Sequence, residues 1–126
     1  MSQPTALIIE DEPKLSNIFS ASLSAVGFET AAITDGLAAL NHLKQSQTAP
    51  SLIVLDLHLP QVSGETLLAE IRANPILKRT RVLMVTADQF MGETLRKDAD
   101  LLLLKPVSVV QLQRLAARLI EKQRRD

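Results

Sequence analysis

Short apolar segments recur along the 126-residue chain, and each is followed by a segment with apolar residues at helical spacing. A short apolar run without polar interruption is typical of a strand buried on both faces of a sheet. Strands are expected at residues 6–9, 28–33, 51–56, 82–86 and 101–104. Helices are expected from Pro13 to a C-cap at Gly27, from a cap at Asp35 to about Gln45, from a cap at Ser63 to Asn74, from Gln89 to Lys97, and from a cap at Ser108 onwards.

The alternation of five strands with five helices predicts one parallel sheet with helices on both faces. Crossovers should be right-handed, and five units are too few for an eight-stranded barrel. We therefore predict an α/β fold of the flavodoxin-like doubly wound type, (βα)5, with strand order 2-1-3-4-5. A single domain over residues 1–126 is expected, with its core at about 5–121; residues 122–126 form either a helix end or the start of a linker.

Helical spacing also assigns an inner face to each helix. The residues assigned to these faces are Leu15, Ile18, Phe19, Ser22, Leu23 and Val26; Leu37, Leu40 and Leu43; Leu67, Leu68 and Ile71; and Val109, Leu112, Leu115, Ala116, Leu119 and Ile120.

Composition excludes several classes of function. Lys and Arg balance Asp and Glu, 14 against 14, so no overall positive charge favours nucleic acid or an anionic membrane. Trp and Tyr are absent, which disfavours stacking on bases, and the absence of Cys excludes disulfides and thiolate metal sites. Neither a signal peptide nor a membrane-spanning apolar run is recognisable. We expect a cytoplasmic protein that neither binds nucleic acid directly nor enters a membrane.

Polar residues collect at the expected carboxyl ends of the strands. Glu10 and Asp11 follow the first strand, and Asp56 ends the third. Thr86 ends the fourth strand, and Lys105 follows the fifth. Open α/β sheets bind ligands at this edge. Because the first and third strands are neighbours in the predicted order, three carboxylates should lie close together.

Such a cluster of negative charges requires a counter-charge. Two unit charges about 4 Å apart repel by roughly 4 kcal/mol at an effective dielectric constant of about 20. A divalent cation relieves this repulsion, and hard oxygen ligands suit Mg²⁺, or Mn²⁺ in its place. The same cation neutralises an incoming phosphoryl group for attack by a carboxylate. Lys105 offers a positive charge to the phosphoryl oxygens, and Thr86 a hydroxyl.

In these residues the chain resembles the receiver domains of response regulators in two-component signalling, over nearly its whole length. Asp56, Pro60 and Gly64 are similar to the phosphoacceptor loop of that family. The resemblance implies that a histidine kinase or a phosphotransfer protein donates a phosphoryl group to Asp56. The domain itself would catalyse this transfer and the later hydrolysis of the aspartyl phosphate, as a signalling switch rather than an enzyme. Output would pass to a partner or domain through the fourth helix, fifth strand and fifth helix.

The resemblance also implies a role for each residue at the strand ends. Asp11, Asp56 and the backbone carbonyl of His58 would bind Mg²⁺ directly, with Glu10 acting through water. The remaining matches are the switch hydroxyl of Thr86, followed by Ala87, and Lys105, followed by a cis proline at Pro106.

His58 has two interpretations. In the first, it is a loop histidine that supplies only its backbone carbonyl. In the second, its side chain pairs with Asp88, two residues beyond Thr86, and the pair overhangs the phosphoryl group and controls the water that hydrolyses it. The second hypothesis assigns His58 and Asp88 to the tuning of dephosphorylation.

The chain departs from the family pattern on the expected output face. Leu102 stands three residues before Lys105, where receivers usually have an aromatic residue. The segment between Thr86 and Lys105 is about one helical turn short, which we place in the fourth helix, and Asp98 stands in place of a frequent glycine. The first interpretation is an altered output contact; the alternative is that Leu102 and its apolar neighbours form a partner or homodimer patch.

Two other functions compete with the phosphorylation switch. A degenerate receiver could act as a phosphorylation-independent protein-binding module, but the intact set of Asp11, Asp56, Thr86 and Lys105 argues against it. A phosphatase of the haloacid dehalogenase type also places a nucleophilic aspartate after a strand. That family requires a second aspartate two residues later, where this chain has His58, and no cap domain fits in this length.

Overall fold

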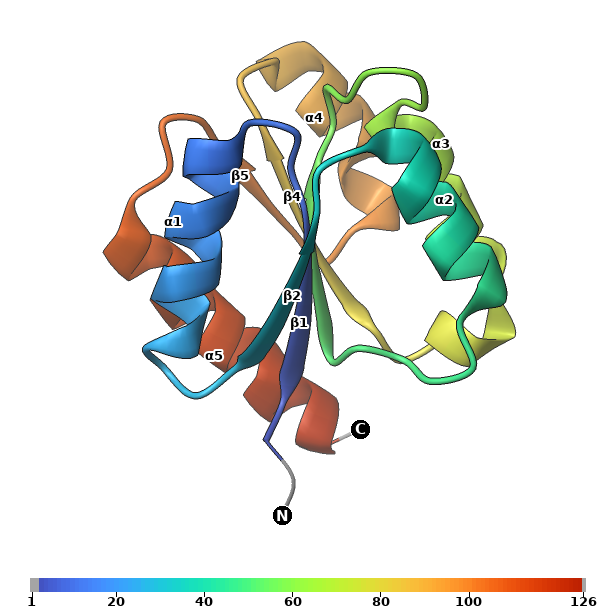
Figure 1. Ribbon diagram of the computed structural model, residues 1–126. Coiled ribbons are helices and arrows are strands. Elements are labelled where there is room, and N and C mark those ends of the chain that lie inside the picture. The colour runs from blue at the N-terminus through green and yellow to red at the C-terminus, as the bar shows by residue number, and fades with distance from the viewer. Residues whose placement is uncertain (1–2, 126) are drawn as a thin grey trace.

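In the computed structural model, which describes residues 3–125, five parallel strands form one sheet in the order β2-β1-β3-β4-β5 (Figure 1). The strands are β1 (Thr5–Ile9), β2 (Glu29–Ile33), β3 (Leu52–Asp56), β4 (Arg81–Thr86) and β5 (Leu101–Leu104). The predicted α/β fold and strand order are confirmed. Each strand ends at its expected residue and begins within one residue of its expected start.

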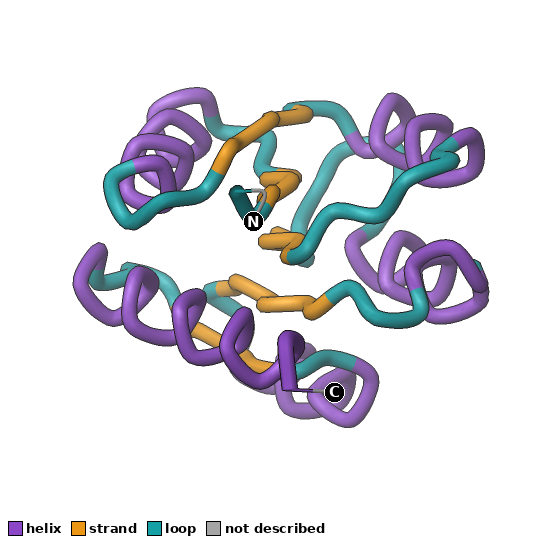
Figure 2. Tube along the Cα trace, turned by 90° about the horizontal axis from the view of Figure 1, so that it is seen from below, coloured by secondary structure: helices purple, strands orange, loops and turns teal. Residues whose placement is uncertain are grey.

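Helices cover both faces of the sheet (Figures 1 and 2). The helices are α1 (Pro13–Ser24), α2 (Gly36–Gln45), α3 (Gly64–Ala73), α4 (Gln89–Leu95) and α5 (Val109–Arg125), with 3₁₀ turns at Pro75–Leu77 and Arg96–Asp98. The helices α1 and α5 lie on one face, and α2, α3 and α4 lie on the other (Figure 1). No helix within residues 3–125 is long and apolar enough to cross a membrane.

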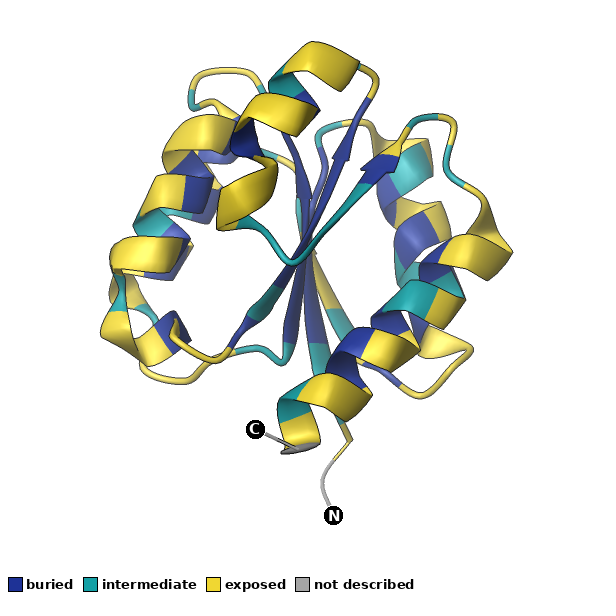
Figure 3. Ribbon diagram, turned by 180° about the vertical axis from the view of Figure 1, so that it is seen from behind, coloured by how far each residue is buried: buried dark blue, intermediate teal, exposed yellow. Residues whose placement is uncertain are grey.

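The core has two layers, separated by the sheet. Phe19 of α1 and Leu112 of α5 pack in one layer, and Leu67 and Ile71 of α3 pack in the other. The inner strands are buried, and all five residues of β3 are inaccessible to solvent (Figure 3). Burial of a Leu, Ile or Phe side chain contributes about 1.5–3 kcal/mol. The site at the end of β3 therefore stands on the best-buried strand of the sheet.

Capping residues set where the helices begin. The predicted caps Asp35, Ser63 and Ser108 each accept a hydrogen bond from the backbone amide three residues further on. Glu12, the third residue of the acidic run Glu10-Asp11-Glu12, is the N-cap of α1. Its carboxylate accepts hydrogen bonds from the amides of Lys14 and Leu15. An acidic side chain at this position also interacts favourably with the helix dipole.

The assignment of inner faces is wrong at four positions. Four residues assigned to inner faces are exposed, with relative solvent accessibilities of 46% for Ile18, 44% for Val26, 48% for Leu37 and 41% for Val109. Val26 lies beyond the end of α1, and Leu37 lies in the first turn of α2. Ile18 and Val109 line an open groove between α1 and the start of α5. Helical spacing places these residues on the correct side, but at the margin of the buried face.

Two helix ends also differ from expectation. The helix α1 ends at Ser24 with its C-cap at Ala25, and not at the predicted cap Gly27. The fourth helix was predicted to reach Lys97, but α4 ends at Leu95 and the chain tightens into a 3₁₀ turn. The helix α5 continues through residues 122–125, the segment predicted to form either a helix end or the start of a linker. Residue 126 lies outside the described residues.

Candidate functional site

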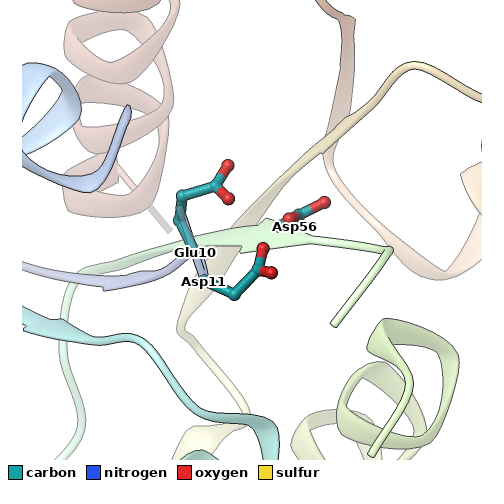
Figure 4. Close-up of side chains that lie close together, drawn as sticks. All are labelled: Glu10, Asp11 and Asp56. Carbon is teal, nitrogen blue, oxygen red and sulfur yellow. The ribbon is translucent and has the colours of Figure 1, made fainter. Parts of the chain in front are cut away.

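Sheet pairing brings three carboxylates together. The strands β1 and β3 are paired with Ile9 opposite Leu55, so the residues that follow, Glu10 and Asp56, emerge side by side. Asp11 is the next residue along from Glu10, and one oxygen atom of each of the three carboxylates lies within 4.8 Å of the others (Figure 4). Burial differs within the cluster: Glu10 and Asp56 are 1 and 2% exposed, and Asp11 is the most accessible of the three.

Asp56 is held by its own loop. Its Oδ1 atom accepts a hydrogen bond of 3.0 Å from the His58 amide. Gly64, at the start of α3, closes the loop so tightly that a Cβ atom there would lie 2.4 Å from the Cα atom of Leu57. Burial raises the pKa of Asp56 above its ordinary value of 3.8, although the His58 amide and Lys105 oppose this change. The loop therefore fixes the carboxylate in a partly desolvated place.

Glu10 is the most strongly perturbed group of the site. Its Oε2 atom accepts a hydrogen bond from the Glu12 amide, and its Oε1 atom lies 3.0 Å from Lys105 Nζ. The buried Oε1 atom has no partner with hydrogen-bond geometry among the described residues, so the contact with Lys105 is an ion pair. Burial raises the pKa of Glu10 from 4.5 to about 7, against the opposing effects of Lys105 and the Glu12 amide.

Lys105 supplies the positive charge. Its Nζ atom lies 3.0 Å from Glu10 Oε1 and 3.6 Å from Asp56 Oδ2. Burial alone lowers the pKa of Lys105, but the carboxylates of Glu10 and Asp56 outweigh it and the pKa rises above 10.5. The peptide bond between Lys105 and Pro106 is cis. The ammonium group therefore stays charged and directed at the carboxylate cluster at physiological pH.

Thr86 lies at the end of β4, next to β3, and is fully buried. Its Oγ1 atom accepts a hydrogen bond of 3.0 Å from the Asp88 amide. Ala87, the next residue, is exposed. A threonine hydroxyl can donate one hydrogen bond while it accepts others, so Thr86 retains its own donor for a ligand.

His58 and Asp88, which stand two residues after Asp56 and Thr86, lie close to each other. Their Nε2 and Oδ2 atoms are 3.7 Å apart, and the two side chains are 55 and 42% exposed. The geometry brings together the pair that the second interpretation of His58 requires. An exposed contact of this kind contributes little to stability, typically below about 1 kcal/mol even when both groups are charged.

Sequence reasoning missed the role of Gly92 in α4. A Cβ atom at Gly92 would lie 2.9 Å from a terminal carbon of Leu102 and 3.1 Å from the methyl group of Thr86. Leu102 is half-buried and packs against the core layer under α2, α3 and α4. A glycine inside a seven-residue helix was the available signal, because glycine in a helix interior is costly and often marks a close approach.

The cluster has the composition of a divalent-cation site. Its donors are hard oxygens of Glu10, Asp11 and Asp56, and Glu10 Oε1 is buried without a hydrogen bond. Hard cations such as Mg²⁺ bind through one or two carboxylates and retain several waters. The residues present therefore fit Mg²⁺ or Mn²⁺, with the exposed Asp11 as the entry to the cluster.

A family model of the response regulator receiver domain matches residues 6–117. The chain belongs to this family. It is 39% identical over 87 residues to the response regulator Rcp1 of Synechocystis, across 64% of this chain and 59% of that protein. It is 34% identical over 112 residues to the phosphate regulon transcriptional regulatory protein PhoB of Rhizobium meliloti, across 86% of this chain and 48% of that protein. The chain thus spans about half the length of these relatives.

Solved structures of receiver domains have the same fold. The receiver domain of the sensor histidine kinase PA1611 from Pseudomonas aeruginosa, with a magnesium ion coordinated in the active site cleft, superposes with a TM-score of 0.83 at 26% identity, covering 95% of this chain and 99% of that one. The receiver domain of a Francisella response regulator superposes with a TM-score of 0.81 at 25% identity, covering 94% and 98%. Two-component response regulators are therefore the relatives of this receiver domain by both sequence and structure.

Proposed function

We propose that this receiver domain is a cytoplasmic phosphorylation switch in which Asp56 accepts a phosphoryl group from the phosphohistidine of a histidine kinase or phosphotransfer protein. One observation carries the proposal. Asp56 is buried at the edge of the sheet with Oδ1 bound by the His58 amide and Oδ2 facing Lys105 at 3.6 Å. This is the setting of a positioned nucleophile rather than of a surface carboxylate.

The transfer is a single displacement at phosphorus. An O–P bond forms at Asp56 Oδ2 while the P–N bond to the donor imidazole breaks, and the imidazole leaves with a proton from solvent. A bound Mg²⁺ supplies charge neutralisation for the phosphoryl oxygens. Asp11 and Asp56, with the His58 carbonyl, would hold this ion directly, and Glu10 would hold its water shell. Lys105 balances part of the charge of about −1.5 to −2 that the phosphoryl group brings.

The apolar groove beside the site is the surface that we assign to the phosphodonor. The groove has a volume of about 500 Å³, and its lining includes Leu15, Ile18, Val107, Val109 and Lys105. Lys105 joins the groove to the carboxylate cluster, so a protein seated there presents its histidine at the open edge of the site. Exposed apolar residues that adjoin a reactive group are typical of a partner surface.

The output face is assigned to α4, β5 and α5. Phe90 in α4 and Leu104 at the end of β5 are 83 and 42% exposed. These apolar side chains support contact with an output partner or domain at this face. A homodimer through the same face is the alternative, and sedimentation that shows a monomer with and without a phosphoryl mimic would remove it.

The pair of His58 and Asp88 is assigned to the hydrolysis of the aspartyl phosphate. The two side chains lie 3.7 Å apart in the unphosphorylated structure, and each would border the water that attacks the phosphoryl group. His58→Ala and Asp88→Ala should each change the decay rate of the phosphorylated form. An unchanged decay rate in both variants would leave His58 with its backbone role alone.

Phosphorylation with a small donor tests the main proposal. Wild-type protein with Mg²⁺ and acetyl phosphate should gain one phosphoryl group by intact mass, whereas Asp56→Asn should gain none. Chelation of the metal should abolish uptake by the wild type. Ile18→Ser is the matched control: it changes the donor groove without touching a carboxylate, and should retain wild-type uptake from this small donor. No uptake by the wild type would support the phosphorylation-independent binding module instead.

A further inference from the structure

Asp88 caps the shortest α-helix among the described residues. Its Oδ1 atom accepts a hydrogen bond of 3.0 Å from the Met91 amide, and its carbonyl oxygen accepts one of 3.0 Å from the Gly92 amide. The helix α4 has seven residues, followed by a 3₁₀ turn. Helices of this length are marginal on their own, so the first turn of α4 depends on its cap and on packing.

The other polar groups of Asp88 point back to the phosphoacceptor. Its amide donates to Thr86 Oγ1 at 3.0 Å, and its Oδ2 atom lies 3.7 Å from His58 Nε2. The His58 amide in turn donates to Asp56 Oδ1 at 3.0 Å. Two routes of direct contact therefore connect the site to the cap of α4, one through Thr86 and one through His58.

The packing of α4 leaves it dependent on the same residues. Its buried residues are Gly92 and Leu95, and Gly92 lies against the side chains of Thr86 and Leu102. Thr86 thus supports α4 twice, through its hydroxyl at the cap and through its methyl group under Gly92. A displacement of the Thr86 side chain removes both supports together.

We propose that Asp88 is a relay that converts phosphorylation of Asp56 into loosening of the first turn of α4. The proposal rests on the proposed function and extends it to how the phosphoryl group is read. The Thr86 hydroxyl turns toward the phosphoryl oxygens and leaves the Asp88 amide. The phosphoryl charge repels the Asp88 carboxylate and competes for His58. Both changes withdraw Asp88 from its capping position, so no aromatic side chain at the position of Leu102 is needed.

Hydrogen exchange of the full chain measures this relay. Exchange in residues 89–95 should be compared with and without beryllofluoride, a stable mimic of the acyl phosphate, in the presence of Mg²⁺. In the wild type, binding of the mimic should accelerate exchange by about 2-fold to 30-fold, the range of measured N-cap contributions. Asp88→Ala should show accelerated exchange without the mimic and little further change with it. Asp88→Ser, which keeps a capping oxygen without the charge, should restore slow exchange in the resting state.

Asp35→Ala is the matched control, because Asp35 caps α2 with a similar hydrogen bond of 2.9 Å to the Ala38 amide. It should accelerate exchange in α2 and leave the response of α4 unchanged. Unchanged or slower exchange in wild-type α4 with the mimic bound would overturn the relay, as would a wild-type response in Asp88→Ala. Intact-mass uptake from acetyl phosphate separates the two proposals: uptake with an unresponsive α4 removes only the relay, and no uptake removes both.

Discussion

Two neighbouring helices on the same face of the sheet, α3 and α4, are built in opposite ways. The helix α3 has ten residues, begins at the end of the loop after β3, and buries three large side chains, Leu67, Leu68 and Ile71. The helix α4 has seven residues and buries one large side chain, Leu95, beside Gly92. Gly64, the first residue of α3, lies against backbone atoms of Asp56 and Leu57, whereas Gly92 in the middle of α4 lies against the ends of the Leu102 and Thr86 side chains.

This difference divides the site into a fixed half and an adjustable half. Glu10, Asp11 and Asp56 belong to the fixed half, because β1 and β3 are paired and the loop after β3 is closed by backbone contact. The Thr86 side chain and Asp88 belong to the adjustable half, because the contacts that join them to α4 are side-chain contacts of modest energy. In the proposed function, phosphoryl transfer therefore takes place on the fixed half, and the response takes place on the half whose contacts yield easily.

The largest effect is expected from a pair of glycine substitutions. In Gly64→Ala, the new Cβ atom would meet the Leu57 Cα atom at 2.4 Å, and backbone cannot move aside, so the free energy of unfolding should fall by about 3 kcal/mol or more. In Gly92→Ala, the contacts are terminal carbons of Leu102 at 2.9 and 3.0 Å, which can shift. The gain in helix propensity offsets this strain, so the change should stay within about 1 kcal/mol.

Denaturant unfolding of both variants checks this expectation. An equal loss of stability in the two variants would show that α4 is packed as firmly as α3. That result would contradict the division of the site into a fixed and an adjustable half.

The second effect is the pH dependence of the fixed half without metal. Because the pKa of Glu10 is about 7 in the folded state and 4.5 in its ordinary state, the folded state holds more protons between these values. The contribution of Glu10 to stability is therefore fully present below pH 4.5 and is lost as the pH rises to about 7, by roughly 3 kcal/mol. The raised pKa of Asp56 acts with the same sign.

Glu10→Gln provides the comparison, measured by thermal or denaturant unfolding from pH 4.5 to 8 in chelator. The variant should be more stable than the wild type at pH 8 and should have the flatter profile. Saturating Mg²⁺ should stabilise the wild type most at high pH, where the carboxylates are ionised. A wild-type stability that rises over this range in chelator would contradict the assignment.

The smallest effect compares two leucines, Leu67 within α3 and Leu102 beneath α4. Leu67→Ala empties a fully buried position in α3 and should cost about 3 kcal/mol. Leu102→Ala removes a half-buried side chain beside Gly92 and should cost about 1 kcal/mol. Equal costs, measured by urea unfolding, would mean that Leu102 is a core residue and not part of the adjustable half.

The sheet and the carboxylate cluster could both be predicted from the sequence, and for the same reason. Apolar runs determine which segments become buried strands. Because β1 and β3 are neighbours, the polar residues at their carboxyl ends then lie close together, however the helices pack on the sheet. Side-chain contacts between elements could not be predicted in this way. The contact of Gly92 with Thr86 and the exposure of Ile18 depend on how a helix is placed on the sheet, which helical spacing does not determine.

The groove lined by Leu15, Ile18 and Val109 shares only Lys105 with the residues that hold or perform the chemistry. If the groove receives the phosphodonor as proposed, its rim can accumulate substitutions that alter which donor binds while the proposed reaction at Asp56 stays the same. Cells that carry several related switches with similar carboxylate clusters face crosstalk between pathways. Placing recognition on a surface separate from the reactive carboxylates insulates one pathway from another, and allows that insulation to evolve one surface residue at a time.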